Sequence, residues 1–358
     1  MQGTLPNANF AAYADAALKS LMDNWYQFGK GSFRDLGWWN TANALETVID
    51  YSFVRPFNNV SAIIQDVYNN RSNEYAKNFI NDYYDDEAWW ALAMVKAFDA
   101  TQNKKYLSTA EAIFDDMLTG WDETACSGGL WWNKSRQQKN AIENELFVTL
   151  GARLYLRTGK NLYLGWAKRA WSWFLKTGML APNGLINDGV DLNTCGNNGK
   201  PTWTYNQGAI LGGLSDLHKI TGDQSYLSTG MRIASSAMTH LVSNTGILTE
   251  PCEYMSQGCG ADGPQFKGIF VRYLSHLYST HPAIIQGGAG KVTDNESATF
   301  LLSCQSFFAR QAISIWNNDR SAENTLGLRW GGPFDGATAS TQSSALDALV
   351  AAVPFGTA

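Results

Sequence analysis

The sequence carries little charge and no concentration of basic residues. Only 16% of its 358 residues are charged, the formal net charge is -5, and lysine and arginine never form a run. Nucleic acids and anionic membranes attract proteins through clustered basic side chains, so we expect neither as a partner. Apolar runs also stay below the roughly 18 consecutive residues of a membrane-spanning helix, so no membrane span is expected.

Motifs for metal or cofactor chemistry are missing as well. The four histidines are scattered, and none belongs to the HExxH pattern of zinc-dependent hydrolases. The cysteine spacing does not match a zinc site, and the GxSxG motif of serine hydrolases is absent. We therefore expect no metal ion and no cofactor.

Cysteine is scarce, and four of the five cysteines fall in loops rich in glycine, asparagine and serine. Disulfide bonds of secreted proteins typically join such loops. Cys252 and Cys259 are close enough to close a small loop, which leaves Cys126 and Cys195 as the other pair, although spacing does not prove the connectivity. Cys304 lies in the apolar helical pattern LLSCQSFF and is expected to be a buried free thiol.

No signal peptide is visible in the first residues, MQGTLPNANF, which fits either an intracellular protein or a processed secreted chain. The loop cysteines favour secretion, and so do four N-x-S sequons at Asn59, Asn70, Asn133 and Asn295. We expect a secreted, extracellular glycoprotein whose signal peptide has been removed. Nothing in the sequence indicates an oligomer, so a monomer is expected.

The sequence is rich in aromatic residues, with 14 tryptophans, and it contains an internal repeat. The pattern T-x4-Y-L begins at Thr101, Thr158 and Thr221, each time between an apolar helical segment and an amphipathic one. A glycine and an aliphatic residue follow each amphipathic segment. The repeating unit is therefore helix, short turn, helix and longer loop.

The repeat extends outward and predicts an all-α fold. Further helical segments span about 9–25, 38–52, 59–78, 266–280, 296–316 and 341–353, which makes twelve helices with those of the three repeats. One set is apolar on nearly all sides and the other is amphipathic, as for inner and outer helices. We expect one catalytic domain over residues 1–358, an (α/α)6 barrel of six inner and six outer helices. An open helical solenoid is the alternative, but the sequence has no polar capping repeat.

Polar and aromatic residues gather where the long loops lead into the inner helices. These segments read GWWNTAN, YYDDEAWW, QKNAIENE, WTYNQG, QFKG and STQSS. Singly, such residues cap helices, but six such segments together favour a lined cleft at one end of the barrel. The candidates for substrate binding are Trp38, Asn140, Asn144, Tyr205, Lys267 and Gln342. For Asn144 and Gln342, helix capping or a hydrogen bond between helices is an equally good interpretation.

The adjacent carboxylates Asp85 and Asp86 are the sharpest catalytic candidates. An acidic first turn also complements a helix dipole, which is the structural interpretation. The flanking tyrosines and tryptophans, however, would raise carboxyl pKa values by desolvation, and two close carboxylates resist double ionisation. One nucleophile and one acid are what glycoside hydrolysis requires.

Several motifs in order resemble glycoside hydrolase family 76, a family of endo-α-1,6-mannanases and related fungal cell-wall enzymes. They are YYDDEAWWALA, KNAIENELF, GLINDG, WTYNQGAILGGL, EPCE with CGADGPQFKGIFVRYL, and TQSSALDAL, spread from about Trp38 to Leu349. The resemblance implies an (α/α)6 barrel that cleaves α-1,6-linked mannan or manno-oligosaccharides with retention. It also implies that Asp85 is the nucleophile, Asp86 the general acid/base and Asp188 a ligand of mannose hydroxyls.

Three other functions compete with an endo-acting hydrolase. Fungal relatives are thought to act as transglycosidases that join mannan-bearing, glycolipid-anchored proteins to wall glucan. Such proteins carry a hydrophobic anchor signal, and because this chain ends in ALVAAVPFGTA, a free hydrolase is favoured. An inactive mannan-binding protein is the second alternative, against which the intact acid pair argues. A different (α/α)6 enzyme, such as a lyase, is the third, but the predicted cleft has few basic residues.

Overall fold

The computed structural model describes residues 8–285 and 294–357, and within these ranges the regular structure of the protein is mostly helical. The inner helices are α2 (Trp38–Val54), α4 (Tyr84–Thr101), α6 (Ala141–Thr158), α8 (Thr204–Thr221), α10 (Phe266–Thr280) and α13 (Ala339–Ala352). The outer helices are α1 (Phe10–Asn24), α3 (Val60–Arg71), α5 (Lys104–Leu118), α7 (Asn161–Lys176), α9 (Gln224–His240) and α12 (Asn295–Asn318). A short helix, α11 (Pro282–Ile285), follows α10.

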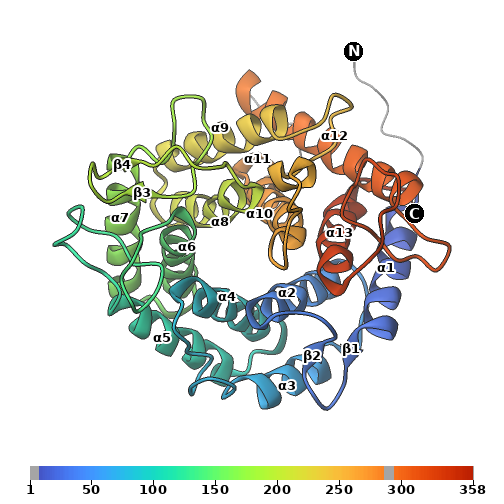
Figure 1. Ribbon diagram of the computed structural model, residues 1–358, viewed down its shortest axis with the longest axis horizontal. Helices are drawn as coiled ribbons and strands as arrows, with labels where there is room; N and C mark the ends of the chain where they lie inside the picture. Colours follow the sequence, from blue (N-terminus) through green and yellow to red (C-terminus); the bar gives the residue numbers. More distant parts are fainter. Residues whose placement is uncertain (1–7, 286–293, 358) are drawn as a thin grey trace.

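The inner helices form a closed ring, which confirms the predicted (α/α)6 barrel. Each inner helix contacts the next one along the chain, and α13 contacts α2 to complete the circle (Figure 1). The N-terminal helix α1 packs on α13, the last inner helix. The inner helices are buried on nearly all sides; in α6, every residue from Ala141 to Leu154 is buried. The solenoid alternative is therefore wrong.

Closure of the ring also involves a buried ion-pair network that the apolar pattern did not predict. Arg272 of α10 pairs with Asp347 of α13 at 2.9 Å and contacts Glu46 of α2. Each of these three side chains is at most 6% exposed. Burial of charge is tolerated where the partners satisfy one another, so this network joins the last inner helix to the first.

The repeated threonine has a specific structural role at the short turns. The hydroxyls of Thr101, Thr158 and Thr221 each donate to the carbonyl four residues earlier, at 2.6 to 2.8 Å. Each hydroxyl also accepts the backbone N–H two residues later, at 3.1 to 3.3 Å. Threonine thus satisfies groups that a helix end leaves free, and the chain can reverse into the outer helix within two residues.

Helix α3 ends earlier than predicted. The expected segment ran to residue 78, but the helix stops at Arg71, and Asn78 and Phe79 adopt positive φ angles of 65° and 59°. This turn inserts Phe79 into the core, where its ring stacks on Trp90 at 4.3 Å. Burial of this ring outweighs the helical preference of the segment.

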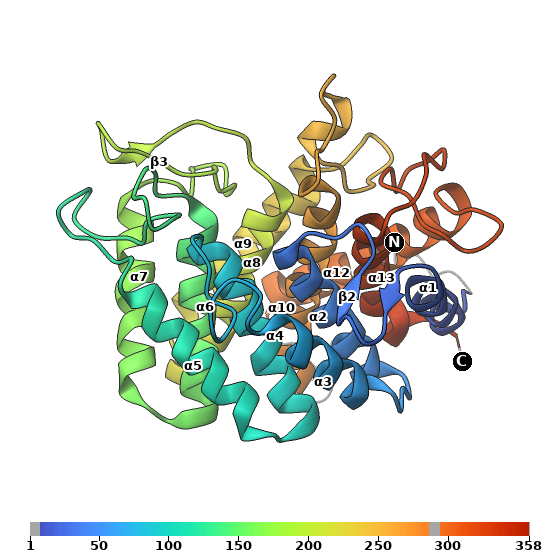
Figure 2. The same ribbon diagram turned by 60° about the horizontal axis from the view of Figure 1, so that its bottom comes forward.

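The long loops lie at one end of the barrel, where the chain enters the inner helices, and the short turns lie at the other end (Figure 2). Two small hairpins occur in these loops: β1 (Tyr26–Gln27) with β2 (Ser32–Phe33), and β3 (Val190–Asp191) with β4 (Gly196–Asn197). Disulfides join Cys126 to Cys195 and Cys252 to Cys259, and Cys304 is buried and free, as expected. No helix within the described residues is long and apolar enough to cross a bilayer.

Candidate active site

A cleft of about 600 Å³ opens among the long loops, above the N-termini of the inner helices. Four inner helices and the loops between them contribute to its walls. The lining includes Trp39, Asp85, Asp86, Trp89, Trp132, Asn140, Asp188, Trp203, Tyr205, Asp262 and Phe266. The structure therefore brings the two catalytic candidates together with aromatic side chains and further carboxylates in one open depression.

Asp85 and Asp86 lie in the first turn of α4, and each carboxylate is held by one donor from a loop. The indole Nε1 of Trp132 donates to Asp85 Oδ2 at 2.9 Å. The side-chain amide of Asn81 donates to Asp86 Oδ2 at 2.8 Å. The second oxygen of Asp85, Oδ1, is buried without a hydrogen-bond partner. The Trp132 bond thus fixes the orientation of the Asp85 carboxylate in the wall of the cleft.

The surroundings of the two carboxyl groups give them different pKa values. Burial raises the pKa of Asp85 to about 6, although the Trp132 hydrogen bond opposes this rise. Burial and the neighbouring charge of Asp85 raise the pKa of Asp86 well above its usual value. Asp85 therefore ionises first while Asp86 keeps its proton, which is the acid–nucleophile division that glycoside hydrolysis uses.

The third acid of the motif, Glu87, points away from the cleft and is fully buried. Its Oε1 accepts the backbone N–H of Asn81 at 3.0 Å and pairs with Lys134 at 2.9 Å. Since the side chain of Asn81 holds Asp86, Glu87 orients the acid/base candidate through Asn81. Burial and the charge of Asp116 raise the pKa of Glu87 to about 8.

Two pairs of stacked aromatic rings flank the carboxylates. Trp39 and Trp89 stack at 5.8 Å, and Tyr205 and Phe266 stack at 3.9 Å with ring planes 8° apart. The indole of Trp39 also donates to Asp262 Oδ1 at 3.0 Å, which fixes the ring. Aromatic faces of this kind offer large, rigid contact area.

Three of the seven predicted binding residues line the cleft: Asn140, Asp188 and Tyr205. Asn140 is the N-cap of α6, and its backbone bridges to Gly189 beside Asp188. Asp188 accepts a long hydrogen bond of 3.4 Å from Asn206, and burial raises its pKa. These three residues come from the α6 and α8 side of the barrel.

Asn144 and Gln342 follow the structural alternative rather than the ligand-binding one, because both amides are fully buried and bind backbone. Asn144 Oδ1 accepts the N–H of Leu130 at 2.8 Å, and Gln342 Oε1 accepts that of Leu326 at 2.7 Å. Gln207 of α8 does the same for Ile186 at 2.8 Å. We call these three side chains the amide clamps; each fastens the loop that precedes its helix.

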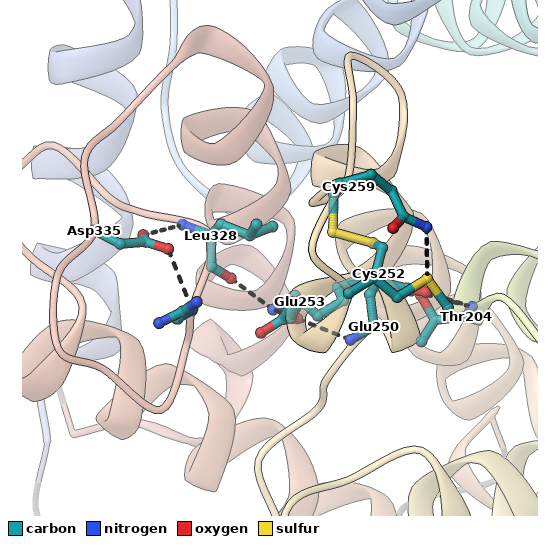
Figure 3. The surroundings of a disulfide bond; sticks show 11 residues. Thr204, Glu250, Cys252, Glu253, Cys259, Leu328 and Asp335 are labelled. Carbon is teal, nitrogen blue, oxygen red and sulfur yellow. Dashed lines mark hydrogen bonds and ion pairs between the residues drawn. A yellow bond between two sulfur atoms is a disulfide. The ribbon is translucent and has the colours of Figure 1, made fainter.

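Lys267 is also buried rather than exposed in the cleft. Its ammonium donates to Glu253 at 2.6 Å and to the Leu328 carbonyl at 2.6 Å. Figure 3 shows Glu253 between Leu328 and the Cys252–Cys259 disulfide. Glu250, in the same turn, accepts the N–H of Thr204 at 3.1 Å at the start of α8. Lys267 therefore joins two rim loops instead of contacting a ligand.

Trp38 belongs to the core as well. It is 7% exposed and packs on Trp90 at 5.6 Å and on Phe79 at 6.5 Å. Its neighbour Trp39 occupies the cleft. Of two adjacent helical residues, which one faces the cleft depends on the rotation of α2 about its axis, and the motif GWWN does not determine that rotation.

Sequence reasoning also missed side chains that loops bring to the cleft, notably Trp132 and Asp262, whereas Trp203 belongs to the predicted segment WTYNQG. A signal existed for Trp132, because GLWWN contains the glycine–leucine step that ends each repeat. Asp262 lies just beyond the small loop closed by Cys252 and Cys259. Within the described ranges, no group of three or more His, Cys, Asp or Glu side chains is placed to hold a metal ion.

The sequence profile of glycosyl hydrolase family 76 matches residues 9–354. A curated relative, the mannan endo-1,6-alpha-mannosidase DCW1 of Candida albicans, is 30% identical over 259 residues, which is 66% of this chain. The same match covers 57% of that relative. The chain thus spans less than two thirds of the length of this relative.

Solved structures share the fold across almost the whole chain. The alpha-1,6-mannanase of Salegentibacter sp. HEL1_6 superposes with a TM-score of 0.83 at 23% identity, covering 97% of this chain and 99% of that one. An inactive variant of that mannanase, with two adjacent aspartates replaced by alanine, is in complex with alpha-1,6-mannotetrose. Its TM-score is 0.82 at 22% identity, and it covers 97% of this chain and 100% of that chain.

Proposed function

This chain belongs to glycosyl hydrolase family 76, and from that premise we propose that it is a retaining endo-hydrolase of α-1,6-linked mannan. The observation that carries the proposal is the acid pair in the cleft, where Trp132 holds the Asp85 carboxylate and Asn81 holds that of Asp86. The names of its relatives, mannan endo-1,6-alpha-mannosidases and an alpha-1,6-mannanase, support α-1,6-mannan as the substrate.

The reaction proceeds in two steps with Asp85 as nucleophile and Asp86 as acid and base. Asp86 gives its proton to the leaving glycosidic oxygen while the Asp85 carboxylate, which lines the cleft, attacks the anomeric carbon. The C–O bond to the leaving sugar breaks, and an ester forms between mannose and Asp85. Asp86 then takes a proton from water, the water oxygen attacks the anomeric carbon, and the ester bond to Asp85 breaks, which releases the mannosyl chain with retained configuration.

Substrate contacts are assigned to the cleft residues beside the acid pair. Asp188 and Asn140 provide acceptors and donors for mannose hydroxyls, and Tyr205, stacked on Phe266, provides a flat face for a sugar ring. The Trp39–Trp89 pair, held through the bond from Trp39 to Asp262, provides a second face. The closed ring of helices supports the interpretation of the chain as one catalytic domain.

Digestion of unbranched α-1,6-mannan tests the proposal. Products are sized by mass spectrometry, and NMR records the configuration of each new reducing end before it mutarotates. We expect short oligosaccharides in the α configuration, and none from the Asp85→Asn or Asp86→Asn variant. Products in the β configuration would refute the retaining mechanism, and products longer than the substrate would assign the chain as a transglycosidase. Binding without cleavage would assign it as a mannan-binding protein.

We also propose that the protein is secreted as a monomer and glycosylated at two of its four sequons. Asn59 and Asn295 are exposed, and Asn59 makes no side-chain capping bond at the start of α3. Asn133 is 5% exposed, and Asn70 donates its amide to Asp66 at 2.8 and 3.0 Å. A glycan at either of these two positions would have to break such contacts.

Peptide mapping after secretion from a glycosylating host tests this assignment. Enzymatic removal of the glycans in heavy-oxygen water leaves a mass label on each asparagine that carried one. We expect the label at Asn59 and Asn295 and unlabelled peptides at Asn70 and Asn133. A fully labelled Asn133 in folded protein would contradict the burial argument.

A further inference from the structure

The charged side chains that line the cleft are all acidic. Four carboxylates line it, those of Asp85, Asp86, Asp188 and Asp262. Among the described residues of its lining, none is lysine, arginine or histidine. A cleft with charges of one sign concentrates its field in the space where a ligand sits.

Asp262 is the member of this set that the catalytic mechanism does not use. It lies on the rim, just after the loop closed by Cys252 and Cys259, and it is exposed (Figure 3 shows this loop). Its charge nevertheless reaches the cleft floor, because it contributes to raising the pKa values of both Asp85 and Asp86. A negative group on a bound sugar would experience the same field.

Nearby cations do not neutralise this field. Lys134 is bound between Glu87 and Asp116, at 2.9 Å from each. Burial raises the pKa of Asp188 and the charge of Lys200 only partly offsets that rise; Lys200 itself is exposed and lies outside the cleft lining. When Asp86 holds its proton for catalysis, the carboxylates of Asp85, Asp188 and Asp262 leave three negative charges around the substrate.

We infer that this cleft selects uncharged α-mannan and discriminates against mannan that carries phosphate or other anionic substituents, with Asp262 as a specificity-determining residue. The inference rests on the proposed mannanase function and refines its substrate class. A phosphate monoester carries about -1.5 to -2 charges near pH 7. Its repulsion by three carboxylates across a partly solvated cleft predicts a kcat/KM about tenfold lower than that of the neutral chain.

The test compares three matched substrates. The first is α-1,6-mannotetraose, the second carries a phosphate monoester at the terminal O6, and the third carries the dimethyl phosphotriester at the same position. The triester has the bulk of the phosphate without its charge. We expect the neutral pair to be hydrolysed at similar rates and the monoester about tenfold more slowly.

Two perturbations separate charge from shape. The substitution Asp262→Asn removes the charge but keeps an amide oxygen that can accept the Trp39 indole hydrogen bond of 3.0 Å. It should reduce the discrimination between triester and monoester about threefold. Asp115→Asn removes an exposed charge on the outer helix α5 and should leave the ratio unchanged. Raising the salt from about 0.01 M to about 1 M shortens the screening length from about 30 Å to about 3 Å and should also reduce the ratio.

The outcomes distinguish this inference from the proposed function. Hydrolysis of all three substrates at equal rates would overturn the charge selection and leave the mannanase assignment intact. Slow hydrolysis of both the monoester and the triester would show that the substituent is excluded by its size and not by its charge. If no substrate is cleaved, the affinities of the same three ligands are measured by calorimetry. Weaker binding of the monoester alone would then support the inference, and equal binding would overturn it.

Discussion

Removal of the Trp132 indole N–H tests how this protein sets the acidity of its nucleophile. In the Trp132→Phe variant, Asp85 Oδ2 loses the donor that now lies at 2.9 Å. Oδ1 already lacks a partner, so the ionised carboxylate would keep little hydrogen bonding from side chains. The pKa of Asp85, which burial raises to about 6 in the intact protein, should therefore rise further.

The size of the shift follows from the strength of the lost bond. A hydrogen bond to a charged group contributes about 1.5 to 3 kcal/mol, and one pKa unit corresponds to about 1.4 kcal/mol. The acid limb of kcat/KM, which reports ionisation of Asp85 in the free enzyme, should move upward by about one to two units. Activity at pH 5 should fall about 10- to 100-fold more than activity at the plateau.

The assay is the pH dependence of kcat/KM on an α-1,6-manno-oligosaccharide from pH 4 to 9. Trp131→Phe is the matched control, since the indole of Trp131 donates to Asp122 at 3.0 Å, away from the acid pair. That variant should keep the acid limb of the intact enzyme. If Trp132→Phe also left the limb in place, either Asp85 is not the ionising nucleophile or the bond does not stabilise its charged form.

Three further predictions concern stability. Lys267→Met leaves Glu253 as a buried, unpaired carboxylate and should lower the free energy of unfolding, measured with urea, by about 3 to 5 kcal/mol. The double variant with Glu253→Gln should recover part of this loss. A loss below about 1 kcal/mol for Lys267→Met would contradict the buried pair. Gln342→Leu leaves the Leu326 N–H unsatisfied and should cost about 1 to 3 kcal/mol, with faster hydrogen exchange at that amide as the local readout. Glu145 is fully buried without a hydrogen-bond partner, and burial raises its pKa well above the usual value, so its cost to folding grows as the pH rises above the unfolded pKa. Glu145→Gln should therefore raise the melting temperature more at pH 7 than at pH 5, and a gain independent of pH would refute this.

The sequence predicted the fold because the repeat encodes local geometry. The threonine of T-x4-Y-L satisfies free groups at a helix end whatever surrounds it, so the pattern marks the short turns of the three repeats. The acid pair was predictable for the same reason, since adjacency places both carboxylates in one helical turn. These features depend on neighbours in sequence, and local reasoning can find them.

Prediction of the binding residues required knowledge of tertiary packing, which the neighbouring sequence does not contain. Trp38 and Trp39 have the same neighbours, but only the rotation of α2 decides that Trp39 reaches the cleft. Asn144 lies one turn below Asn140, and a loop covers it. Asp262 and Trp132 arrive on loops whose paths are set by distant contacts. The helix face on which a residue lies and the depth to which its side chain is buried are both set by tertiary packing. These two properties account for the predictions that failed.

The amide clamps have a consequence for how this end of the barrel can change. Asn144, Gln207 and Gln342 recognise the backbone of the loops and make no demand on the side chains that those loops carry. A loop can therefore exchange its exposed side chains while its path stays the same, as long as the buried side chains at the clamped positions Leu130, Ile186 and Leu326 are kept. Exposed side chains at the rim of the cleft can therefore change while the inner helices stay the same, and new sugar preferences can arise in this way.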